Sequence, residues 1–147
     1  MQHLATVDTV SVRLETVLTR LSARFRSLPE SKLLGRLSND GRSRAAAGHE
    51  LAGMVALAAQ GVEDRAREVP PTWRALPFDG PFVVGDQIGV AGHDLLVACA
   101  GAAAADPAVE VWARVPGDES RSGCERVGIE ELLRRVLAAA EKLAGAL

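Results

Sequence analysis

The chain has 147 residues, 48% of them hydrophobic, and its 17 basic and 19 acidic side chains give a net charge of −2. These values predict one domain with one buried core, and they exclude a disordered chain. Aromatic residues make up only 3% of the sequence, too few for a base-stacking surface, and the basic residues form no cluster dense enough for a nucleic-acid surface. No basic, apolar leader opens the sequence and no stretch reaches the length of a membrane span, so we expect a soluble, cytoplasmic protein. The excess of arginine over lysine is typical of a GC-rich bacterial genome.

Apolar residues spaced by three and four predict a long amphipathic helix over residues 7–28, which Pro29 ends. The same spacing predicts a last helix over residues 128–146. Two such helices at the ends of a chain indicate a small helical bundle. The residues expected to be buried are Val7, Val10, Leu14, Val17, Leu21, Phe25 and Leu28 in the first helix, and Ile129, Leu132, Val136, Ala140, Leu143 and Leu147 in the last.

Between these helices, a short helical turn is expected over 30–37 and a longer helix over 44–69. Ser43 is a suitable N-cap for the longer helix, and Pro70 and Pro71 would end it. The loop 70–81 then joins the two halves of the chain. Its aromatic residues, Trp73 and Phe78, are expected to cover one end of the bundle.

Residues 82–105 are compatible with a hairpin or a helix, and we favour the helix because a lone hairpin would have few strands with which to pair. Alternating apolar residues over 109–115 predict a strand, and 116–123 reads as a polar loop. The expected fold is thus mainly α: a single helical domain over 1–147, built as a small bundle of three or four principal helices. A short strand or hairpin within 82–115 is left open.

Two histidines, His49 and His93, lie in predicted helices, with Asp86 about two turns before His93. Inward-pointing histidines and carboxylates build the metal sites of helical bundles, so these three residues are candidate ligands for a divalent metal. Residues 43–52 and 85–96 faintly resemble the DinB-type four-helix proteins. In those proteins, helix-borne histidines bind a metal that activates a thiol or a water. The predicted last helix lacks their H-x-x-x-H pair.

A second candidate site is the start of the helix at 44, where Arg42, Ser43 and Arg44 could bind an anion with the free backbone N–H groups. Capping of the helix is the simpler role for these residues. Gly85, Gly89 and Gly92 match no nucleotide-binding motif, and their spacing favours the close approach of a neighbouring helix.

The two cysteines have neither disulfide nor metal spacing; Cys99 is expected in the core and Cys124 in a loop. No catalytic motif is present. We therefore expect a non-catalytic soluble interaction or structural module, without a cofactor, that self-associates through helix packing or binds a protein partner. The alternative is a metal-dependent hydrolase or thiol transferase that uses His49 and His93.

Overall fold

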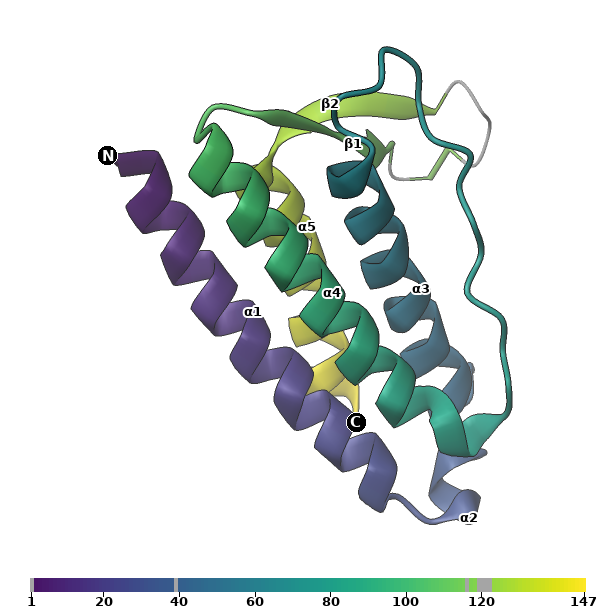
Figure 1. The fold of residues 1–147 in the computed structure, drawn as a ribbon. Helices are drawn as coiled ribbons and strands as arrows, with labels where there is room; N and C mark the ends of the chain where they lie inside the picture. Colours follow the sequence, from purple (N-terminus) through teal and green to yellow (C-terminus); the bar gives the residue numbers. More distant parts are fainter. Residues whose placement is uncertain (1, 39, 116, 119–122) are drawn as a thin grey trace.

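The computed structural model describes residues 2–38, 40–115, 117–118 and 123–147, and side chains from residue 6 onward. It confirms a mainly helical bundle with a short hairpin (Figure 1). Most of the predicted loop 116–123 lies outside the described residues. In chain order, the elements are α1 (Gln2–Ser27), α2 (Glu30–Leu33), α3 (Arg44–Glu63), a 3₁₀ turn (Pro81–Val83), α4 (Val84–Ala105), β1 (Glu110–Arg114), β2 (Cys124–Gly128) and α5 (Ile129–Ala146).

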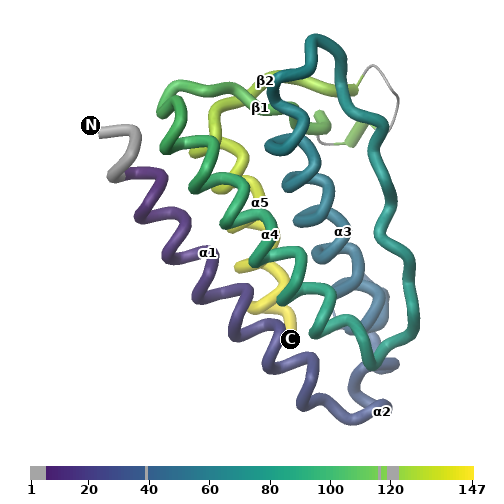
Figure 2. Tube along the Cα trace, in the orientation of Figure 1, coloured from purple at the N-terminus to yellow at the C-terminus, as the bar shows by residue number. Residues whose placement is uncertain are grey.

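The four long helices pack as α1 against α4, α4 against α3, and α5 against both α1 and α3. Helices α1 and α5 run in one direction, and α3 and α4 in the other (Figure 1). Because α3 and α4 are parallel, the chain must return along the whole bundle between them. Residues 64–80 make this return as a long connection without helix or strand, which we call the strap (Figure 2).

Helix prevails over hairpin in residues 84–105, as favoured from the sequence. The predicted strand is also present as β1, and it pairs antiparallel with β2, Val111 opposite Val127 and Trp112 opposite Arg126. The second strand lies beyond 115 and includes Cys124, which was expected in a loop, and Gly128, which was expected to start the last helix. It escaped prediction because only Val127 of its five residues is buried, so no alternation marks it.

Helix α3 ends at Glu63, and its predicted continuation to 69 is wrong. The hairpin binds the backbone carbonyls that a longer helix would use internally. Trp112 Nε1–H donates to the carbonyl oxygen of Arg67 at 3.1 Å, and the Arg126 guanidinium donates to the carbonyl oxygens of Arg65 and Arg67 at 2.6 and 2.8 Å. Tertiary hydrogen bonds therefore replace helical ones and start the strap before the prolines are reached.

The apolar seams of α1 and α5 face the core, with one difference in register. Leu18 is buried, whereas Val17, the seam residue expected there, is only partly buried. In α5 a second row, Leu133 and Leu137, is buried beside the predicted one. Each helix touches two others, so its buried face is wider than a two-position seam.

The glycines of α4 let α1 approach closely, as their spacing predicted. A Cβ at Gly85 would lie 2.8 Å from the carbonyl oxygen of Ser22, and one at Gly92 would lie 2.9 Å from Leu18 Cδ1. The buried Ser22 hydroxyl donates to the carbonyl oxygen of Gly85 at 2.7 Å. This close contact fixes α4 on α1 and leaves the opposite side of α4 facing outward.

Candidate functional site

A groove of about 920 Å³ lies between α3, α5, the end of β1 and the strap. Its size is that of a pocket for a small organic molecule, and apolar side chains make most of its walls. From α3 come Met54, Leu57 and Ala58; from α5, Leu132, Val136 and Ala138; and from the strap, Trp73, Ala75 and Leu76.

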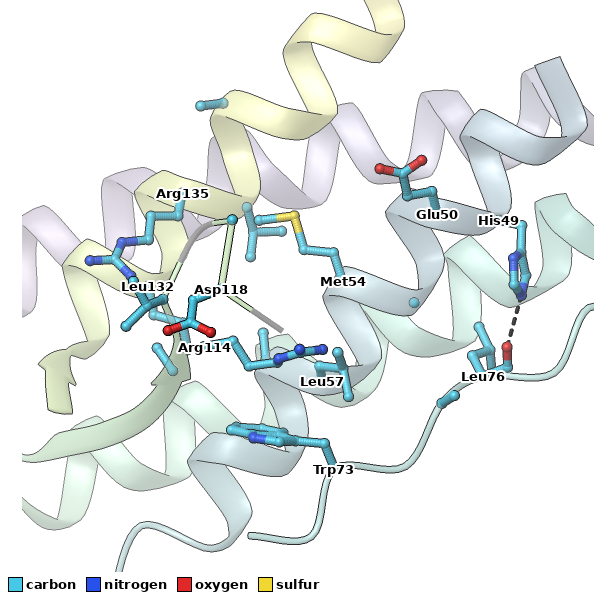
Figure 3. A pocket seen from close by; sticks show the side chains of 18 of the residues that line it. His49, Glu50, Met54, Leu57, Trp73, Leu76, Arg114, Asp118, Leu132 and Arg135 are labelled. Atoms are coloured by element: carbon cyan, nitrogen blue, oxygen red, sulfur yellow. Dashed lines mark hydrogen bonds between the residues drawn. The ribbon is translucent and has the colours of Figure 1, made fainter. Parts of the chain in front are cut away.

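Charged side chains gather at one end of this groove: Arg114 from β1, Arg135 from α5, and Asp118 (Figure 3). Arg135 donates to Glu125 at 2.5 Å and to Glu131 at 3.0 Å, and these hydrogen bonds, that to Glu125 first, raise its pKa. Its Nη1 atom is buried and has no hydrogen-bond partner among the described residues.

Arg114 differs from Arg135 in having no ion pair with any described residue. Its side chain is partly buried at the end of β1 and extends toward Leu57 above Trp73 (Figure 3). Within the described residues, the guanidinium of Arg114 makes neither a hydrogen bond nor an ion pair. The groove therefore contains a cation, Arg114, that none of the described carboxylates binds.

The strap forms the outer wall of the groove and is held by side chains of α3 and α4. The Gln60 side chain exchanges two hydrogen bonds with the backbone of Arg74, at 2.9 and 3.0 Å. His49 Nε2 bonds the Leu76 carbonyl oxygen at 2.9 Å, and its ring meets Phe78 edge-on. Gln87 Nε2 donates to the carbonyl oxygen of Pro77 at 2.8 Å. The wall is thus fixed at several points along its length.

The sequence suggested that both aromatic residues of the strap would cover one end of the bundle, but the two lie at different heights along α3. Phe78 is exposed beside His49. Trp73 lines the groove, and its Nε1–H donates to Cys124 Sγ at 3.2 Å, which joins the strap to β2. The two residues lie at different points along the bundle because the strap runs lengthwise (Figure 2).

The three candidate metal ligands have separate surroundings. His49 bonds the strap, His93 is exposed on α4, and Asp86 accepts a hydrogen bond from Arg26 at 2.6 Å. In the part of the chain that the structure describes, no three or more His, Cys, Asp or Glu side chains form a group that could hold a metal.

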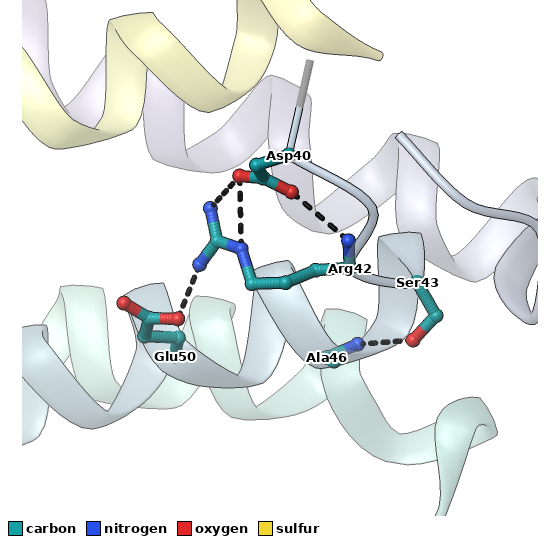
Figure 4. Close-up of polar contacts among 5 residues, drawn as sticks. All are labelled: Asp40, Arg42, Ser43, Ala46 and Glu50. Atoms are coloured by element: carbon teal, nitrogen blue, oxygen red, sulfur yellow. Dashed lines mark hydrogen bonds and ion pairs between the residues drawn. The ribbon is translucent and has the colours of Figure 1, made fainter. Parts of the chain in front are cut away.

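The candidate anion-binding residues are engaged within the protein (Figure 4). Arg42 donates to Asp40 at 2.6 and 2.9 Å and also pairs with Glu50. These hydrogen bonds lower the pKa of Asp40. Ser43 caps α3 by accepting from the backbone N–H of Ala46 at 3.0 Å, as predicted. Arg44 donates to the carbonyl oxygen of Lys32.

The outward face of α4 is a second candidate surface. Val90 and Val97 are 63% and 57% exposed, two helical turns apart, with His93 and Asp94 between them. Exposed small residues, Ala100, Gly101 and Ala104, continue the face toward the end of the helix. Among the described residues, Pro81–Ala105 is the one helical segment with the length and mean hydropathy, 1.5, of a membrane-crossing helix, a criterion that core helices also meet.

Sequence reasoning missed Arg114, Asp118 and Arg135. The alternation over 109–115 placed Arg114 on the side of the strand opposite the apolar residues. No local signal indicates that side chains of α3 and α5 lie beside it and form the walls of a groove.

The chain matches no protein-family model, no curated protein and no solved structure.

Proposed function

We propose that the protein is a non-catalytic interaction module that self-associates through the outward face of α4. The observation that carries the proposal is the exposure of Val90 and Val97 at the centre of this face. Exposed apolar side chains are common singly, but an aligned pair continued by small residues is typical of an interface.

The order of residues along α4 fits a second copy of the same chain. When two copies of one helix pack antiparallel about a twofold axis, positions equally far from the axis meet. An axis between His93 and Asp94 would set Val90 against the partner's Val97, and His93 against the partner's Asp94. The face therefore matches itself in both apolar contact and hydrogen bonding, which argues for this occupant over an unrelated protein.

A lipid bilayer is a less suitable occupant of the same face. His93 and Asp94 lie at its middle and Asp86 near its start. Burying such groups in hydrocarbon is costly, whereas a second copy would set His93 and Asp94 opposite one another. The other side of α4 is already buried against α1 and α3.

The test is sedimentation equilibrium at micromolar concentrations on the wild type and on Val97→Glu. We expect a wild-type dimer and a monomeric variant, because Val97→Glu would bury a charge at the interface. Val12→Glu is the matched control: Val12 is 62% exposed on α1 among polar side chains, so this variant should remain dimeric. Circular dichroism would verify that each variant keeps its helices.

Charge reversal tests the antiparallel pairing itself. His93→Glu should weaken the dimer because it sets two carboxylates opposite one another, and Asp94→Arg should weaken it because the partner's His93 loses its acceptor. The double variant should recover much of the affinity, because Glu at 93 would face the partner's Arg at 94. A wild-type monomer, or equal loss of dimer in the Val12 and Val97 variants, would contradict the proposal. Binding of the monomer to phospholipid vesicles that Val97→Glu abolishes would favour the bilayer instead.

A further inference from the structure

We propose that the groove between α3, α5, β1 and the strap binds a small apolar molecule that carries a single carboxylate. Arg114 would hold the carboxylate, and the apolar walls would enclose the rest of the molecule. This site is formed by residues other than those of the α4 face, so the inference does not depend on self-association.

The first argument is the state of Arg114. A guanidinium is always charged near neutral pH, and it is ordinarily paired when it lies against apolar side chains. Arg114 is partly buried beside Leu57 and Trp73, and no described residue pairs with it. Its planar fork of N–H donors fits both oxygens of a carboxylate. A bound acid would supply the missing partner.

The second argument comes from Arg135 at the same end of the groove. Glu125 and Glu131 already balance its charge, yet its Nη1 atom is buried without a partner. Buried donors in proteins are bonded to protein, water or a bound group in the great majority of cases. A ligand head held by Arg114 would thus lie at the same end of the groove as this second guanidinium, one donor of which no described residue satisfies.

The walls and Asp118 narrow the class of ligand. The walls carry apolar side chains that form no hydrogen bonds with a ligand, among them Met54, Leu57, Leu132 and Val136. Such walls suit a hydrocarbon chain or ring, and the flexible Met54 side chain can adjust to the shape of the ligand. Asp118 lies between Arg114 and Arg135 (Figure 3). Its negative charge disfavours a head with more than one charge, such as a phosphate monoester. An apolar molecule with a single carboxylate fits the apolar walls and has a head with only one charge.

Methionine offers a local reporter for the test. The chain has two methionines, Met1 and Met54, and Met54 lines the groove. With methyl-¹³C methionine, titration with decanoate should shift the Met54 resonance and leave that of Met1 unchanged. Decanol, which has the same chain without the acid, should bind about tenfold or more weakly, as expected for loss of a charge-assisted hydrogen bond.

Variants separate recognition of the acid from apolar binding. Arg114→Gln should weaken decanoate about tenfold and leave decanol unchanged. Arg134→Gln is the control, since Arg134 lies on the exposed side of α5 and pairs with Glu130. Asp118→Asn should tighten decanoate by removing a like charge.

Three results would overturn the proposal. One is equal binding of decanoate to the wild type and to Arg114→Gln. Another is equal affinity for decanoate and decanol. The third is tighter binding of decyl phosphate than of decanoate, which would assign the groove to a different head group. Because every titration is read at Met54, binding elsewhere on the protein would leave the signal unshifted and would count against the groove.

Discussion

The carbonyl oxygen of Trp112 occupies the space in which a side chain at Gly61 would begin: a Cβ there would lie 1.9 Å from it. The last turn of α3 and the backbone of β1 are therefore in direct contact, with no side chain between them. This contact places the hairpin across the end of α3 and brings Arg114, two residues further, to the groove.

Gly61→Ala should lower stability by about 3 kcal/mol or more, because the hairpin backbone would have to move. Thermal denaturation followed by circular dichroism would measure the change. Gly53→Ala is the control on the same helix: no atom lies within 4 Å of its added Cβ, so higher helix propensity should stabilise it by up to ~1 kcal/mol. Equal melting temperatures for the two variants would contradict this account of the contact.

The contact between α1 and α4 predicts a graded series. Gly85→Ala meets the backbone of Ser22 and Arg26 and should cost about 1–3 kcal/mol. Gly89→Ala and Gly92→Ala should cost less, because they meet the rotatable Ser22 hydroxyl and the flexible end of Leu18. Urea denaturation of the three variants gives the order. Melting of all three above the wild type would show that the helices are not closely packed there.

The two thiols should differ sharply in reactivity. Burial raises the pKa of Cys99 to about 12, so at pH 8 almost none of it is thiolate, the form that reacts. Cys124 is partly exposed. We expect a disulfide reagent to label one thiol rapidly in the folded protein at pH 8 and both thiols in guanidinium. Cys124→Ser should remove the rapid phase, and a rapid phase that survives in this variant would place Cys99 in solvent.

The sequence predicted the helices well where local chemistry decides their limits. Pro29 follows α1, Ser43 caps α3, and Asp106 and Pro107 follow α4. Where a segment distant in the sequence determines the limits of an element, the prediction was wrong. The end of α3 depends on hydrogen bonds from Trp112 and Arg126, and β2 exists because β1 lies beside it.

The candidate site lay further beyond sequence reasoning than the fold did. Spacing within a helix could suggest His49 and Asp86 as ligands. It could not predict that His49 bonds the carbonyl oxygen of Leu76 or that Asp86 pairs with Arg26. The groove takes its walls from four separate elements. Its character depends on Arg114 having no partner among the described residues, and pairing across the fold is not encoded in any local pattern.

The parallel course of α3 and α4 has a kinetic consequence. In an up-and-down bundle, successive helices meet as soon as a short turn forms. Here the contact between α3 and α4 requires the whole strap to be laid down first, and α1 meets α5 only across most of the chain, as the pairing of Arg13 with Glu141 illustrates. Contacts between residues far apart in the sequence form only after a large loss of chain entropy, which packing offsets later. We therefore expect this protein to fold more slowly than a bundle of equal length with short turns.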